Sequence, residues 1–121
     1  MVYKRQFLRL ILAVMVLGFS LSFSLEPVLA HARIEVGPYV IIVGWVEEPV
    51  IVGERNAILI EVSKNEEPVT GLEGTLDINI LYGGRTFIGD LSPTTTPGLY
   101  HAEIFPTVRG QYTVLLSGTI E

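Results

Sequence analysis

Residues 75–91 read TLDINILYGGRTFIGDL, and this stretch decides the fold. Apolar and polar residues alternate from Leu76 to Ile80, as expected for a strand with one buried face and one solvated face. Gly83 and Gly84 follow, and glycine accepts the positive φ angles that a two-residue hairpin turn requires. The stretch therefore predicts a β-hairpin whose return strand begins at Arg85.

The same alternation recurs on both sides of this hairpin. Gly, Pro, Asn and Ser separate the apolar segments, and residues 64–74 and 92–98 are expected to be polar loops. A break is expected at Gly37-Pro38, with Pro38 at a bulge or a sheet edge because proline cannot donate to a central ladder. The further strands are expected within residues 33–49 (RIEVGPYVIIVGWVEEP), 56–63 (NAILIEVS), 99–105 (LYHAEIF) and 111–120 (QYTVLLSGTI).

About seven strands in residues 31–121 predict an all-β fold, an immunoglobulin-like antiparallel β-sandwich. A small open barrel is the structural alternative. Tyr100 and Tyr112 each follow a glycine turn near the start of a late strand, a position from which a buried tyrosine can bond its hydroxyl to nearby backbone. Trp45 ends an apolar strand, where it serves either as a core or rim anchor or as a platform on which a ligand stacks.

The first 30 residues have the pattern of a secretory signal-peptide helix. Three cations in residues 4–9 precede an uncharged apolar run from Leu10 to Leu25, which is shorter than the roughly 20 residues of a spanning helix. Signal peptides are cleaved after small residues, so cleavage after Ala30 or after Ala32 would fit. We therefore expect residues 1–30 to be a signal peptide, with a retained N-terminal membrane anchor as the alternative, and residues 31–121 to be one domain in the periplasm or at the cell surface.

Charge and cysteine content narrow the classes of partner. Residues 31–121 hold five of the eight Lys and Arg residues but twelve of the thirteen Asp and Glu residues, so the domain is acidic. Such a surface repels nucleic acid and anionic lipid, and membrane contact is expected only through an uncleaved leader or a longer chain. The chain contains no cysteine, so an exported domain must be stabilised without disulfides and has no thiolate for catalysis or for zinc.

The segment PGLYHAEIFPTVRGQYTVLLSGTI, residues 97–120, resembles small exported immunoglobulin-like modules of bacteria, of the YtkA-like and CopC-like kinds. The first half resembles uncharacterised exported proteins that carry such a module. The resemblance implies a sandwich fold and a link with transport or metal handling. Sandwiches of this kind host many roles, so the function must come from the site.

Two histidines, His31 and His101, are the candidate metal ligands. CopC-like copper carriers resemble this chain in beginning with His-Ala after the leader, here His31-Ala32. Cleavage after Ala30 would let the α-amine and the ring of His31 chelate Cu(II), with His101 as the third nitrogen and Glu103 nearby on the same strand face. Leu99 stands where those carriers have the aspartate of an Asp-x-His pair, and both methionines lie in the leader. The alternative is a leader remnant and a surface histidine, with no cofactor.

No pattern in the sequence predicts an enzyme. The serines at 63, 92 and 117 lack a nucleophile-elbow pattern, although His101 could be the partner of one of them. We expect a non-catalytic binding or accessory module that contacts an unknown protein of the envelope through exposed loops or a strand edge. A copper-binding protein and a structural spacer domain of a longer envelope protein are the alternatives.

Overall fold

The computed structural model describes residues 31–121. The predicted signal-peptide helix, residues 1–30, and the processing of the leader lie outside these residues. Within residues 31–121, no helix is long and apolar enough to cross a membrane.

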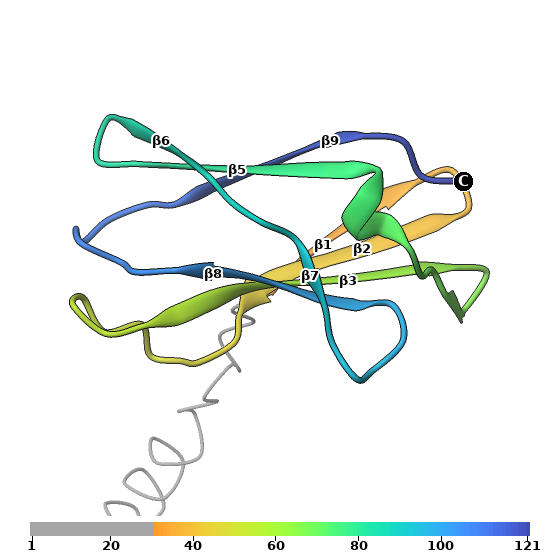
Figure 1. The fold of residues 1–121 in the computed structure, drawn as a ribbon, viewed down its shortest axis with the longest axis horizontal. Helices are drawn as coiled ribbons and strands as arrows, with labels where there is room; N and C mark the ends of the chain where they lie inside the picture. The colour runs from red at the N-terminus through yellow and green to blue at the C-terminus, as the bar shows by residue number, and fades with distance from the viewer. Residues whose placement is uncertain (1–30) are drawn as a thin grey trace, which may run out of the picture.

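Two antiparallel sheets form the described part of the chain (Figure 1). The large sheet has the strand order β1-β2-β3-β8-β7, with β4 paired to β3, and the small sheet has the order β6-β5-β9. The prediction of an all-β sandwich is thereby confirmed, and seven of the described strands have four or more residues. The elements are β1 (Ala32–Val36), β2 (Tyr39–Trp45), β3 (Asn56–Lys64), β4 (Glu67–Pro68), the 3-10 helix η1 (Leu72–Gly74), β5 (Leu76–Tyr82), β6 (Arg85–Ile88), β7 (Ser92–Pro93), β8 (Leu99–Ile104) and β9 (Thr113–Gly118).

The hairpin that decides the fold forms as predicted. Gly83 and Gly84 have φ angles of 56° and 71°, and the turn pairs Tyr82 with Arg85. β1 and β2 form a second hairpin across the expected break at Gly37-Pro38. The expected bulge or edge at Pro38 was wrong, because the proline lies in a tight turn, where it has no ladder hydrogen bond to donate.

Alternate side chains of both sheets form one core. The predicted inward residues of β3, β5 and β8 are at most 7% exposed, except Tyr82 at the end of β5, which is half-buried against the core. The segment 64–74, expected to be a polar loop, also contributes, because η1 buries Leu72. The central core residues are Ile58, Ile60, Val62, Leu76, Ile78, Ile80, Tyr100, Ala102 and Ile104.

Two tyrosine hydroxyls bond to backbone, as their positions predicted. The Tyr100 hydroxyl donates to the carbonyl of Val69 at 2.7 Å and accepts from the N–H of Leu72 at 3.3 Å. The Tyr112 hydroxyl donates to the carbonyl of Val108 at 2.7 Å. Tyr100 thus fastens the segment before β5 to the core, whereas Tyr112 fastens the loop before β9.

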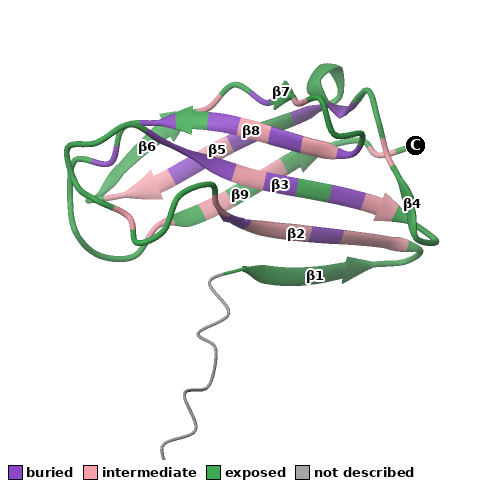
Figure 2. Ribbon diagram, turned by 90° about the horizontal axis from the view of Figure 1, so that it is seen from below, coloured by how far each residue is buried: buried purple, intermediate pink, exposed green. Residues whose placement is uncertain are grey.

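The small sheet covers only part of the large one. Trp45 at the end of β2 contacts Tyr112, just before β9, and the Tyr39 hydroxyl at the start of β2 donates to the carbonyl of Ile120, just after β9. β9 therefore lies over β2 and antiparallel to it, and β1 lies one strand beyond β9. Figure 2 shows β1 at the margin of the large sheet, with exposed residues along its whole length.

Candidate functional site

The two candidate metal ligands lie on the outer face of the large sheet. His31 precedes β1, and its ring lies over Gly44 of β2, where any larger side chain would collide with the imidazole. His101 lies in β8 and is half-buried. Glu103 shares its strand face, as the alternation predicted.

The strand register separates the two histidines. Gly44, beneath the ring of His31, pairs with Leu59 of β3, and Leu59 pairs with His101. The backbones of His31 and His101 are therefore three strand spacings, or about 14 Å, apart, and the His31 ring over Gly44 still lies two spacings, or about 10 Å, from the strand that carries His101. Metal–nitrogen bonds are only about 2 Å long, so the structure does not bring the two imidazoles to one ion. Within residues 31–121, no three His, Asp or Glu side chains gather as metal ligands do.

A polar hollow surrounds His101. Ser92 of β7 pairs with His101 in the register, and Glu103 and Arg55 also line the hollow. Asn56, which also lines the hollow, makes three side-chain hydrogen bonds: its amide donates to the carbonyl of Glu47 and its oxygen accepts the backbone N–H groups of residues 47 and 57. The hollow thus combines an imidazole, a carboxylate and a hydroxyl on an open surface.

An aromatic stack links the two sheets at the end of the sandwich where β2 and β8 end. The rings of Tyr82 and Tyr112 stack with centroids 4.6 Å apart and an interplanar angle of 21°. Trp45 meets Tyr112 edge-on at 5.2 Å. Trp45 is half-buried and packs against the core, which is the rim position that was one of its two predicted roles. The stack forms a base beside the loops around it.

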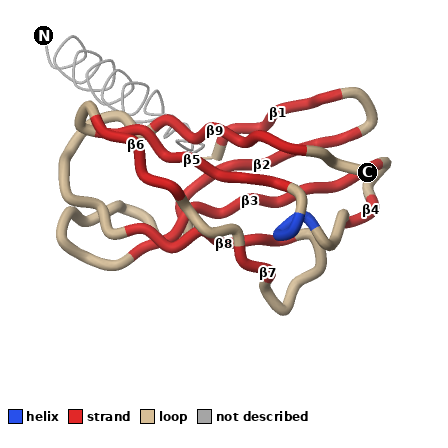
Figure 3. Tube along the Cα trace, turned by 45° about the horizontal axis from the view of Figure 1, so that its top comes forward, coloured by secondary structure: helices blue, strands red, loops and turns tan. Residues whose placement is uncertain are grey.

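Two loops rest on this base and expose apolar side chains. The backbone N–H of Gly53 donates to the carbonyl of Pro106 at 2.8 Å, which ties the loop after β2 to the loop after β8. Figure 3 shows these loops together at one end of the strands. We call this surface the apolar end, and its exposed large apolar residues are Val46, Ile51, Val52, Phe105 and Val108.

The composition of the apolar end is unusual for loops. Connecting segments are usually polar, yet both loops place large apolar side chains in solvent, beside a shallow cleft that Trp45, Val108 and Tyr112 help to line. Val52 and Val108 line this cleft, whereas Val46 lines the hollow beside His101, and large apolar side chains exposed on one surface can mark an interaction site. Exposed loops or a strand edge are the surfaces expected from the sequence, but these residues were not among the predicted ones. The signal was present, because VEEPVIVG and FPTVRG place apolar residues between turn formers.

No protein-family model matches the chain, and the comparisons with curated proteins and with solved structures found no significant match.

Proposed function

We propose that the protein is a non-catalytic binding or accessory module that works outside the cytosol and contacts its partner through the apolar end. The leader-like sequence of residues 1–30 supports export, and the partner would be a protein of the cell envelope. The resemblance to YtkA-like and CopC-like modules supports a role beside transport or metal handling.

The observation that carries this proposal is the exposure of five large apolar side chains on two loops that are joined by a backbone hydrogen bond and adjoin the aromatic stack. Phe105 is 53% exposed and Ile51 is 51% exposed. Burying such side chains against a partner gains about 25 cal/mol for each Å² of apolar surface. The hydrogen bond between Gly53 and Pro106 and the aromatic stack limit the conformations of the two loops, which would lower the entropic cost of binding.

A structural spacer domain, the alternative function, would need no exposed apolar surface, so an experiment can distinguish it from a binding module. The double variant Val52→Ser/Phe105→Ser removes apolar surface without altering the core, and Ile88→Ser is a matched control because Ile88 is 79% exposed on β6. The exported proteins are compared by native electrophoresis of gently solubilised envelopes. We expect the wild type and the control to migrate in a complex larger than two copies and the double variant to leave it. Identical migration of all three would refute the proposal.

A further inference from the structure

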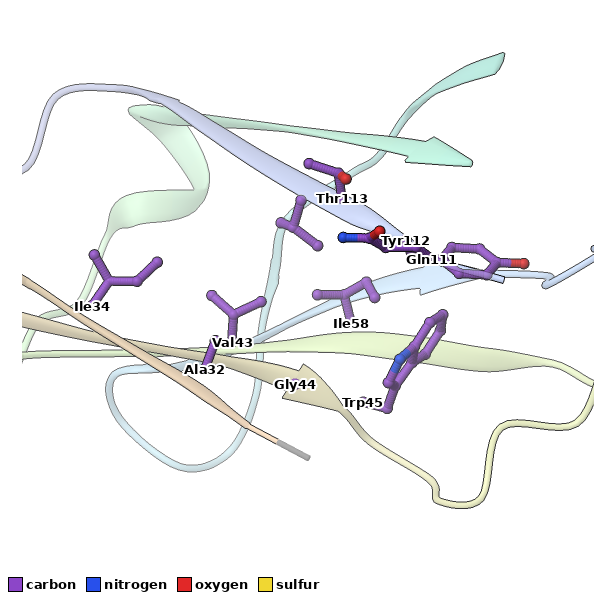
Figure 4. Close-up of a pocket in the computed structure, with 10 residues that line it drawn as sticks. Ala32, Ile34, Val43, Gly44, Trp45, Ile58, Gln111, Tyr112 and Thr113 are labelled. Atoms are coloured by element: carbon purple, nitrogen blue, oxygen red, sulfur yellow. The ribbon is translucent and has the colours of Figure 1, made fainter. Parts of the chain in front are cut away.

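The inner face of β1 is apolar, and no strand within residues 31–121 covers it. Ala32, Ile34 and Val36 point towards the small sheet, but Ile34 is 47% exposed and Val36 is 56% exposed. The corresponding face of β2 is covered by β9, whereas no described strand lies opposite β1. Figure 4 shows Ile34 and Ala32 at the margin of an open groove whose opposite wall is formed by residues 111–114.

The free edge of β9 borders the same groove. β9 pairs only with β5 among the described strands. The N–H of Thr119 donates to the carbonyl of Thr75, so the alternation of an antiparallel ladder directs the backbone groups of Val114, Leu116 and Gly118 away from β5. This edge contains no charge and no proline, which are the usual protections of an exposed edge against pairing.

The exposed inner face of β1 and the free edge of β9 border the same gap, which is the width of one strand. One further strand beside β9 would cover the inner face of β1 and satisfy the free backbone groups of β9. β1 has five residues and β9 has six, so a second β1 strand fits this place in length. Its own apolar face would then meet the apolar face of the first β1.

We propose that two copies of this chain form a symmetric dimer in which β1 of each copy pairs with β9 of the other. A two-fold axis parallel to the strands achieves this, because it exchanges the two layers and preserves strand direction. β1 and β9 run in the same direction, since both are antiparallel to β2, so the new pairing is parallel. Residues Ile34 and Val36 of the two copies then pack face to face across the usual sheet separation of about 10 Å.

Charge and area both allow this dimer. The chain is acidic overall, but β1 carries only Arg33 and Glu35, which form a 3.1 Å ion pair on the outer face and bring no net charge to the interface. Each copy pairs β1 with β9 of the other over about 17 Å and covers the inner face of the other copy's β1. Together these contacts remove on the order of 1,200 Å² of accessible surface from water. This area is the lower limit of a stable interface, so we expect reversible association in the micromolar range.

The mass of the exported protein tests the proposal. Sedimentation over a hundredfold range of micromolar concentrations should show the mass of the wild type rising from one copy to two. Ile34→Lys should remain monomeric throughout, while Ile88→Lys, on β6, should dimerise as the wild type does. A wild type that stays monomeric, or an Ile34→Lys variant that still dimerises, would overturn the proposal.

Cross-linking gives a second test that does not depend on the stability of a lysine variant. The chain has no cysteine, so Ile34→Cys and Ile88→Cys each introduce a single thiol. A short bis-maleimide should join two copies through position 34 and not through position 88. Equal cross-linking at the two positions, or none at position 34, would contradict the arrangement of the strands.

Discussion

Removing the Tyr100 hydroxyl should destabilise the protein far more than removing the Tyr112 hydroxyl. Both hydroxyls donate to a backbone carbonyl at 2.7 Å, and Tyr→Phe keeps the ring in both cases. Tyr100 is 2% exposed, so Tyr100→Phe leaves a part-buried carbonyl and a buried N–H with one partner fewer, which costs about 1–3 kcal/mol. The carbonyl freed by Tyr112→Phe lies at the surface, where water replaces the lost bond, and we expect a cost below about 0.5 kcal/mol.

Urea unfolding of the exported proteins measures this difference. For a domain of this size the free energy of unfolding falls by about 1 kcal/mol per molar urea, so Tyr100→Phe should lower the midpoint by about 2 M. Tyr112→Phe should lower it by less than about 0.5 M. Equal shifts, or a Tyr100→Phe midpoint equal to that of the wild type, would refute the conclusion that this buried hydroxyl fastens the segment before β5 to the core.

Three further predictions concern the loop after β2, the packing of β8 and the histidines. Asn56→Ala should lower the free energy of unfolding by about 2–3 kcal/mol, because three hydrogen bonds of a buried side chain are lost; a loss below about 1 kcal/mol in thermal unfolding would contradict this. Gly98→Ala should cost at least about 2 kcal/mol more than Gly53→Ala in urea unfolding, since both glycines have positive φ but only at Gly98 would the new methyl group meet backbone, at 2.9 Å; equal costs would count against this packing. Cu(II) titration of protein that begins at His31 should give the same affinity with and without His101→Ala, and a large loss of affinity in the variant would mean that the two histidines share an ion after all.

The strands could be predicted because apolar and polar residues alternate along them, so that every second side chain is suited to burial. Residues 58–62 and 100–104 alternate between core and solvent, and the structure buries the expected ones. Which strands pair with each other was harder to predict, because a strand shows the same alternation whichever strand lies next to it. The register that separates His31 from His101 depends on the order β1-β2-β3-β8, which no local pattern specifies.

The working surface was harder to predict than the fold. Trp45, Tyr82 and Tyr112 are far apart in the sequence, and only the packing of the two sheets brings their rings together. The exposure of Ile34 could not be predicted from the sequence either. Its alternation indicates a buried face, but β1 lies beyond the margin of the small sheet. A period of two identifies a face that is suited to burial and does not show whether anything covers it.

Photo-cross-linking in intact cells tests most directly whether the apolar end is the surface through which this protein meets its partner. A photoreactive amino acid replaces Phe105 in one exported variant and Ile88 in the other, so that both probes are exposed but only the first lies at the apolar end. We predict a discrete adduct, larger than two copies of the chain, from position 105 and none from position 88. Adducts of the same size and yield from both positions, or none from position 105, would contradict the account.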